Sequence, residues 1–200
     1  MHTDTYKTIT HPCEGLYKEK GSKFIAYAFP VASKEHAMSI IDETKKKHHT
    51  ARHHCWAYRL GYDGNEYRVN DDGEPSNSAG KPILGQIDAF SLTQILLLVV
   101  RYFGGTLLGV GGLIHAYKEA AKDALLSAEI CTKHVPYIVS MTCNYEELPS
   151  IIEYISQHNG TIISQNYLET CALVCELTKQ HYEQLLQYSS KYSSLSLHLT

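Results

Sequence analysis

Polar and hydrophobic positions follow two different periods along this chain. Alternating character predicts half-buried strands, whereas apolar residues at helical spacing predict amphipathic helices. In the first 90 residues the pattern predicts four strands and two helices, with Ser33 as the N-cap of the first helix. The strands are expected at residues 6–10, 24–31, 52–60 and 66–69, and the helices at residues 34–49 and 82–90.

Residues 93–103 form a continuous apolar run that is rich in β-branched side chains. Such a run predicts a strand buried on both faces in the centre of a sheet. A glycine-rich turn is expected over residues 104–112, followed by a strong helix with one apolar face. That face carries Leu113, Ala116, Tyr117, Ala120, Ala121, Ala124, Leu125 and Ala128.

The pattern changes around residues 130–136, and we place a domain boundary near residue 133. The remainder predicts the order strand, helix, strand, strand, helix, strand, which is the ferredoxin-like pattern. These elements are expected at residues 135–143, 146–158, 161–168, 171–177, 179–188 and 195–199. The chain is therefore expected to be an α+β protein with domains at residues 1–132 and 133–200.

The composition is that of a globular protein, with 44% hydrophobic and 20% charged residues. The longest apolar run is shorter than the about 20 residues that span a bilayer, and the N-terminus shows no signal-peptide pattern. The six cysteines are scattered without a Cys-x-x-Cys pair. Because such usage fits a reducing compartment, we expect a cytoplasmic protein with no membrane partner.

The net charge of −3 is unevenly distributed. Basic and acidic residues are equally frequent in residues 1–132, whereas acidic residues predominate in residues 133–200. Nucleic-acid-binding domains usually carry strong, clustered positive charge. Any RNA contact must therefore rest on a local patch, and no DNA partner is expected.

The glycine-rich turn is the sharpest candidate for a binding site. Free backbone N–H groups and the helix dipole at such a turn attract anions, and Arg101 just before it could contact a phosphate. Known phosphate-binding patterns do not match: no Gly-Lys-Ser/Thr follows, and Ile114 stands where a dinucleotide motif needs glycine. The alternative is that the glycines only permit tight turns and close helix–sheet packing.

Asp71, Asp72 and Glu74 form a second candidate site. Neighbouring carboxylates could bind Mg²⁺ or act as acid and base. The Asp-Gly and Glu-Pro pairs in this segment are equally typical of ordinary turns. The lysine run at residues 45–47 is interpreted as a solvated helix end, although it could also steer an RNA backbone.

The strand at residues 52–60 carries histidine, cysteine and aromatic side chains that need interpretation. His53 and His54 should point to opposite faces and cannot share a metal ion, so no metal site is predicted there. Cys55 is expected to be small and buried, because His53 lies too far away to act as its base. Trp56 and Tyr58 share a face with Leu60 and are expected in the core.

Three segments together resemble the signature of the YigZ/IMPACT family. They are residues 52–57 (RHHCWA), residues 71–84 with DDGEP and AGKPIL, and residues 100–113 with VRYFGGTLLG. The resemblance covers about residues 15–128, and the tail is similar to the extra domain of bacterial members. It implies a first domain with the fold of the second domain of ribosomal protein S5, which is also domain IV of elongation factor G. The second domain should resemble the C-terminal, ferredoxin-like domain of that factor.

The resemblance also implies a function. Eukaryotic IMPACT members act in translational control by interfering with activation of a stress-responsive initiation-factor kinase, and RNA or ribosome binding is inferred for bacterial members mostly from the fold. We therefore expect a non-enzymatic regulator that binds RNA, the ribosome or a translation-associated protein. The expected contact residues are Arg52, His54, Lys81, Arg101, Gly104, Gly105, Gly109, Gly111 and Gly112.

Two alternatives stay open. One is a Mg²⁺-dependent hydrolase or phosphoryl-transfer enzyme that uses Asp71, Asp72 and Glu74 as catalytic residues. The other is a regulator that binds proteins alone. No cofactor is expected for either kind of regulator, whereas the enzyme would use Mg²⁺.

Two segments depart from the family pattern. Asn77 stands in Ser76-Asn77-Ser78, where the family commonly has glycine, and it is expected to take the same left-handed conformation. Lys118 and Glu119 follow Tyr117 where the family often has a glycine pair after an aromatic residue, so this helix should be better formed here.

Overall fold

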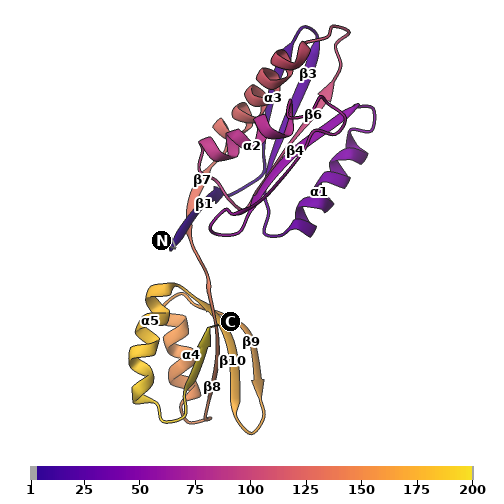
Figure 1. The fold of residues 1–200 in the computed structure, drawn as a ribbon. Coiled ribbons are helices and arrows are strands. Elements are labelled where there is room, and N and C mark those ends of the chain that lie inside the picture. The colour runs from indigo at the N-terminus through magenta and orange to yellow at the C-terminus, as the bar shows by residue number, and fades with distance from the viewer. Residues whose placement is uncertain (1–3, 200) are drawn as a thin grey trace. The chain divides into compact units, whose positions relative to one another are not determined.

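The computed structural model of the protein describes residues 4–199. The chain forms two compact units that divide between Lys133 and His134 (Figure 1). Each unit contains one larger β-sheet together with helices that pack on it. The α+β class expected from the sequence is therefore confirmed.

The first unit is built on a five-stranded antiparallel sheet with the order β2-β3-β6-β4-β5. Its central strand, β6, is buried along almost its whole length, as the continuous apolar run predicts. The strands are β2 (Cys13–Glu19), β3 (Ser22–Pro30), β4 (His53–Leu60), β5 (Glu66–Asn70) and β6 (Ile95–Tyr102).

Three helices cover the two faces of this sheet (Figure 1). One face carries α1 (Lys34–Lys47), and the other carries α2 (Gly80–Ala89) and α3 (Gly109–Leu126). Trp56 and Tyr58 are only 4% and 3% exposed and belong to the hydrophobic cluster on the α1 face, so their prediction as core residues is confirmed.

The first residues of α1 and α3 can be compared with the helix starts that the sequence predicts. Ser33 caps α1, because its hydroxyl accepts a hydrogen bond from the backbone N–H of His36 at 3.2 Å. Helix α3 begins at Gly109, so Gly111 and Gly112 lie inside it, and the prediction of a turn through residue 112 is wrong. The left-handed φ of Gly109, +69°, marks the end of the turn, and the glycines after it adopt helical angles, although glycine is less favourable there than alanine.

The sequence pattern does not predict strand β2, because Pro12 and Gly15 are residue types that are typical of turns. In the structure Gly15 pairs with Ala26 of β3 at the point where α3 crosses the strand. A Cβ atom on Gly15 would lie 2.2 Å from the backbone nitrogen of Ala124. Gly15 therefore permits close helix–strand contact rather than a turn.

A small two-stranded sheet joins β1 (Thr5–Ile9) to β7 (Ile130–His134). The backbone N–H of Thr10 continues this pairing by donating to the carbonyl oxygen of Glu129 at 3.0 Å. Strand β7 was not predicted either. Its side chains are mostly exposed, so no alternation of polar and apolar residues marks it.

The second unit has the strand order β11-β8-β10-β9, and its element order confirms the ferredoxin-like pattern. Its core lies between the sheet and two helices and includes Val139, Met141 and Leu173. Its elements are β8 (Tyr137–Cys143), α4 (Leu148–Gln157), β9 (Thr161–Tyr167), β10 (Cys171–Leu177), α5 (Lys179–Tyr188), the short 3₁₀ helix η1 (Ser189–Lys191) and β11 (Ser196–Leu199).

All six cysteines are free thiols. Cys171 and Cys175 are both buried on the helix-facing side of β10, because residues four apart on a strand share a face. Within residues 4–199, the helices lack the length and apolar character needed to cross a membrane.

Two glycine-to-alanine substitutions test the close contact between β2 and α3. Gly15→Ala should lower the free energy of unfolding of the first unit by about 3 kcal/mol, because the new methyl group meets backbone atoms that cannot move alone. Gly85→Ala is the matched control, since nothing lies within 4 Å of its Cβ position in α2. It should raise that free energy by about 0.5–1 kcal/mol.

Urea unfolding followed by the fluorescence of Trp56 gives both values. Trp56 is the single tryptophan and lies in β4, so its signal reports on the first unit. Equal effects of the two substitutions would contradict the assignment of Gly15 as a packing residue.

Candidate functional site

Arg101 lies near the end of β6, on the sheet face covered by α2 and α3. Its cross-strand neighbours are Phe24 of β3 and His53 of β4, so these three side chains share one face. The guanidinium carbon lies 5.5 Å from the centroid of the Phe24 ring and 5.7 Å from that of Phe103. Arg101 is only 6% exposed, so its charge needs a partner inside the protein.

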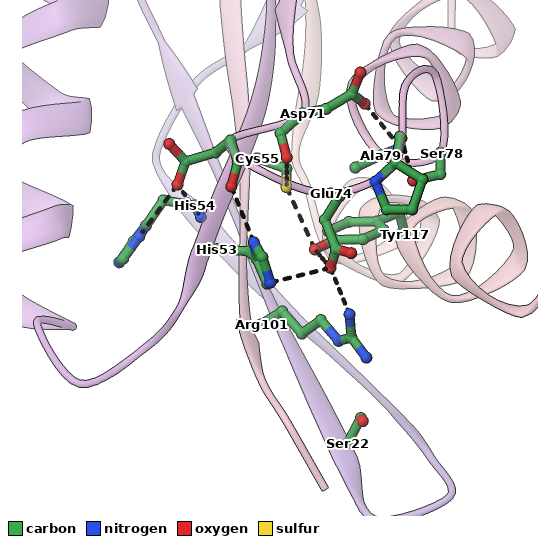
Figure 2. A network of polar contacts seen from close by, with 12 residues as sticks. Ser22, His53, His54, Cys55, Asp71, Glu74, Ser78, Ala79, Arg101 and Tyr117 are labelled. Carbon is green, nitrogen blue, oxygen red and sulfur yellow. Dashed lines mark hydrogen bonds and ion pairs between the residues drawn. The ribbon is translucent and has the colours of Figure 1, made fainter. Parts of the chain in front are cut away.

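That partner is Glu74, on the loop between β5 and α2. One carboxylate oxygen of Glu74 accepts from Nη1 of Arg101 at 2.6 Å and from the hydroxyl of Tyr117 at 2.8 Å. Nε2 of His53 points at the same oxygen from 4.0 Å (Figure 2). The additional hydrogen bond from Tyr117 compensates part of the cost of burying this ion pair.

Cys55 lies deeper in the same network. Its sulfur is 3.0 Å from the carbonyl oxygen of Asp71 and 3.3 Å from the hydroxyl of Tyr117. Burial raises the pKa of the Cys55 thiol and that of the Tyr117 hydroxyl. Because a thiol must ionise to act as a nucleophile, Cys55 is the small buried residue that we expected.

The loop around Glu74 is held by Asp71, whose carboxylate accepts from three backbone N–H groups at the start of α2. One oxygen is 3.0 Å from the nitrogen of Ala79 and 2.8 Å from that of Gly80, and the other is 2.8 Å from that of Asn77. Asn77 has φ +62°, so the expected left-handed conformation is confirmed. Asp71 thus caps α2 and shapes the loop.

Asp72 points toward the other side of the sheet. Its carboxylate forms an ion pair with Nζ of Lys45 at 3.2 Å and accepts from the backbone N–H of His54 at 2.7 Å. Asp71, Asp72 and Glu74 therefore point in three directions, and each binds protein donors. The structure does not bring them together at one point, so the geometry does not favour the hydrolase hypothesis.

The structure does not bring His54 together with Arg101 either. His54 is 6% exposed, and its Nε2 lies 3.2 Å from the carbonyl oxygen of His48 at the end of α1. His53 instead faces Glu74, which confirms that the two histidines lie on opposite faces (Figure 2). Arg52 is exposed just before β4, and Lys81 is exposed in the first turn of α2.

The glycines after β6 have different roles. A Cβ atom on Gly104 would lie 1.8 Å from the carbonyl carbon of Gly21, and the N–H of Gly104 donates to the hydroxyl of Ser22 at 3.1 Å. Gly104 is therefore required for close packing between the end of β6 and the β2–β3 turn. This agrees with the alternative that the glycines permit tight turns and close packing. Gly105 and Gly109 have φ +88° and +69°, and nothing lies within 4 Å of their Cβ positions.

Among the residues that the structure describes, no side chain caps the N-terminus of α3. Leu108 occupies the capping position without a side-chain hydrogen bond, and the glycines at 109 and 111 leave the space above the first turn open. The first N–H groups of a helix lack internal partners and attract anions. Within the described residues, Nε of Arg101 is also buried without a hydrogen-bond partner. The start of α3 therefore offers backbone donors to an anion.

Sequence reasoning missed Tyr117 and His53 as members of this network. The signal for His53 was present, because alternation along β4 places it on the face of Arg101. The role of Tyr117 carried no local signal, since its partners Glu74 and Cys55 are 43 and 62 residues away in the sequence.

Comparison with known proteins gives consistent matches. Residues 20–125 match the Impact N-terminal domain. A Haemophilus influenzae protein named IMPACT family member is 34% identical over 166 residues, which cover 82% of this chain and 81% of that protein. The Escherichia coli protein IMPACT family member YigZ is 35% identical over 150 residues, with 74% of each chain covered. A crystal structure described as that of a hypothetical protein has a TM-score of 0.80 at 30% identity and covers 98% of this chain and 97% of its own.

A double-mutant cycle tests the buried ion pair. Arg101→Met should lower the free energy of unfolding by about 3–5 kcal/mol, because it leaves the Glu74 carboxylate buried without a cation. Adding Glu74→Gln should recover part of this loss, since the neutral amide needs no counter-charge. Urea unfolding followed by Trp56 fluorescence measures each variant, and strictly additive losses would rule out the coupling.

Proposed function

Because this chain belongs to the IMPACT family, we propose that it is a non-enzymatic regulator related to translation whose first unit binds RNA. The proposal places an RNA phosphate at the start of α3, next to the end of β6. The single observation that carries it is the uncapped and open N-terminus of this 18-residue helix. An anion placed there gains free backbone donors and the favourable end of the helix dipole.

Arg101 supports the same position. Its guanidinium has one strong bond to Glu74 and an Nε without a hydrogen-bond partner among the described residues, so it has spare donor capacity. Its low exposure and its ion pair with Glu74 fit a role in holding the end of β6 in place beside the start of α3.

The exposed ring of Phe103 favours RNA over a free phosphate ion as the ligand. Phe103 is 46% exposed and packs on the guanidinium of Arg101, immediately before the glycine turn. Exposed aromatic rings beside phosphate donors are a recurrent way to stack unpaired RNA bases. A ligand with both bases and phosphates would therefore use more of this surface than a single anion.

A charge substitution in the first turn of α3 tests the proposal. Gly111 lies in the third position of the helix, with open space around its Cβ position. Gly111→Asp should preserve folding, since acidic residues are favoured at helix N-termini, but it places a carboxylate where the phosphate would bind. We expect affinity for an RNA hairpin with single-stranded ends to fall about tenfold, which corresponds to about 1.4 kcal/mol.

Gly111→Asn is the matched control, because it adds nearly the same volume without the charge. It should bind within about twofold of the natural chain, a difference of less than about 0.5 kcal/mol. Filter binding at about 50 and about 200 mM salt gives both affinities and their salt dependence. Equal binding by the Asp and Asn variants would remove the start of α3 from the RNA contact.

A pull-down from lysate with and without nuclease separates this function from that of a regulator that binds proteins alone. An RNA-binding regulator should lose captured partners after nuclease treatment, whereas a regulator that binds proteins directly should keep them.

A further inference from the structure

A second group of cations lies on the opposite face of the same sheet end. Lys18 of β2 pairs with Lys23 of β3, and Lys23 pairs with Tyr102 of β6. Arg52 immediately precedes His53, whose partner is Arg101, so continuation of the antiparallel register brings Arg52 beside Tyr102. Cross-strand partners share a face, so Lys18, Lys23 and Tyr102 lie in one line across three strands, and Arg52 follows at the end of this line, just before β4. We refer to Lys18, Lys23 and Arg52 as the basic row.

The contacts of Tyr102 identify the face on which this row lies. Its ring packs against the hydrophobic cluster on the α1 side of the sheet, together with Val100 and Ile25. Its hydroxyl lies 2.8 Å from Nδ1 of His48, the C-cap residue that follows α1. The basic row is therefore next to the C-terminal end of α1, whereas Arg101 faces α2 and α3.

The last turn of α1 adds further cations beside the row. Lys45, Lys46 and Lys47 all lie in this turn. Nζ of Lys47 lies 5.7 Å from the centroid of the Tyr27 ring, whose hydroxyl is 2.9 Å from Nε2 of His48. Lys47 thus adds positive charge on the α1 side of the sheet, beside Tyr27.

Few of these cations form ion pairs, although Glu14 and Glu43 line the same pocket as Lys47. Of these cations, only Lys45 forms an ion pair, with Asp72, within the part of the chain that the structure describes. Lys18, Lys23 and Arg52 are all exposed. Like charges directly opposite each other on a sheet are destabilising, so the Lys18–Lys23 pair costs folding free energy. A local conflict of this kind points to a functional site.

We propose that the basic row binds the phosphodiester backbone of RNA, as a second contact beyond the glycine turn. This inference rests on the proposed RNA-binding function. Three strand spacings separate Lys18 from Arg52, so the row extends over about 14 Å, which suits a linear polyanion better than a single phosphate. Tyr102, half-buried between the cations, offers an aromatic edge of the kind found in grooves that follow a nucleic-acid strand.

Chain connectivity favours one continuous ligand for the two contacts. Tyr102 in the row is separated from Gly104 of the glycine turn only by Phe103. An RNA strand could therefore pass around the end of the sheet, with its phosphates on the row and at the start of α3. Unpaired bases of an RNA strand would in addition stack on the exposed ring of Phe103.

Neutralising the row tests the inference without disturbing the core. Lys18→Gln/Lys23→Gln should weaken binding of the same RNA hairpin about tenfold at low salt. It should also reduce the slope of log affinity against log salt by about 0.7–0.9 for each phosphate that the protein no longer neutralises. The melting temperature should stay equal or rise, because two opposed charges are removed.

The matched control is Lys118→Gln/Lys122→Gln. These exposed lysines lie on the solvent side of α3, and their removal changes the net charge by the same amount. This variant should bind RNA as the natural chain does. If both double variants weaken binding equally, net charge explains the effect and the basic row is overturned as a site.

The remaining outcomes separate this inference from the proposed function. Loss of binding in Gly111→Asp with unchanged binding in Lys18→Gln/Lys23→Gln overturns the row and leaves the glycine turn. The reverse result supports the row and removes the glycine turn. Competition by polyglutamate as effective as that by unlabelled RNA would show an unselective polyanion surface and would also overturn the inference.

Discussion

The buried ion pair between Arg101 and Glu74 is the interaction on which the rest of the first unit depends. It joins the end of the central strand to the loop before α2, and the Tyr117 hydroxyl adds α3 to the same carboxylate. A charge in so little contact with solvent is tolerated only with a well-aligned partner, so this pair fixes the position of the whole loop. The capping of α2 by Asp71 and the contacts of Asp72 follow from that position.

This network explains why a loop rich in carboxylates can be a structural element. Each carboxylate group accepts hydrogen bonds or an ion pair from the chain itself, and the three groups diverge to α2, α1 and β6. Because these carboxylates are bonded within the chain, few polar groups of this loop are free to bind a ligand. What remains open lies at the end of the sheet, where the glycines at 105, 109 and 111 have empty space around them.

Much of the fold could be predicted from the sequence, because alternation and helical spacing report directly on which side chains are buried. The prediction failed where a residue has a role in packing between distant segments. Gly15 in β2 and Gly104 after β6 are of a residue type that is typical of turns. In the structure each instead permits close contact with a segment far away in sequence. Strand β7 is mostly exposed and left no pattern to detect. For the candidate site, Arg101 was found because it precedes a glycine-rich turn, whereas Tyr117 depends on tertiary contacts alone.

Strand alternation also determines how the cations of the first unit are divided between the two faces. Arg101 and Tyr102 are adjacent in β6, so one must face α2 and α3 while the other faces α1. Their cross-strand neighbours follow the same rule, which gathers Lys23 with Tyr102 and leaves Phe24 with Arg101. A balanced net charge therefore coexists with a local concentration of positive charge on one face. A sum over the sequence cannot detect such a surface, but the register of the sheet can.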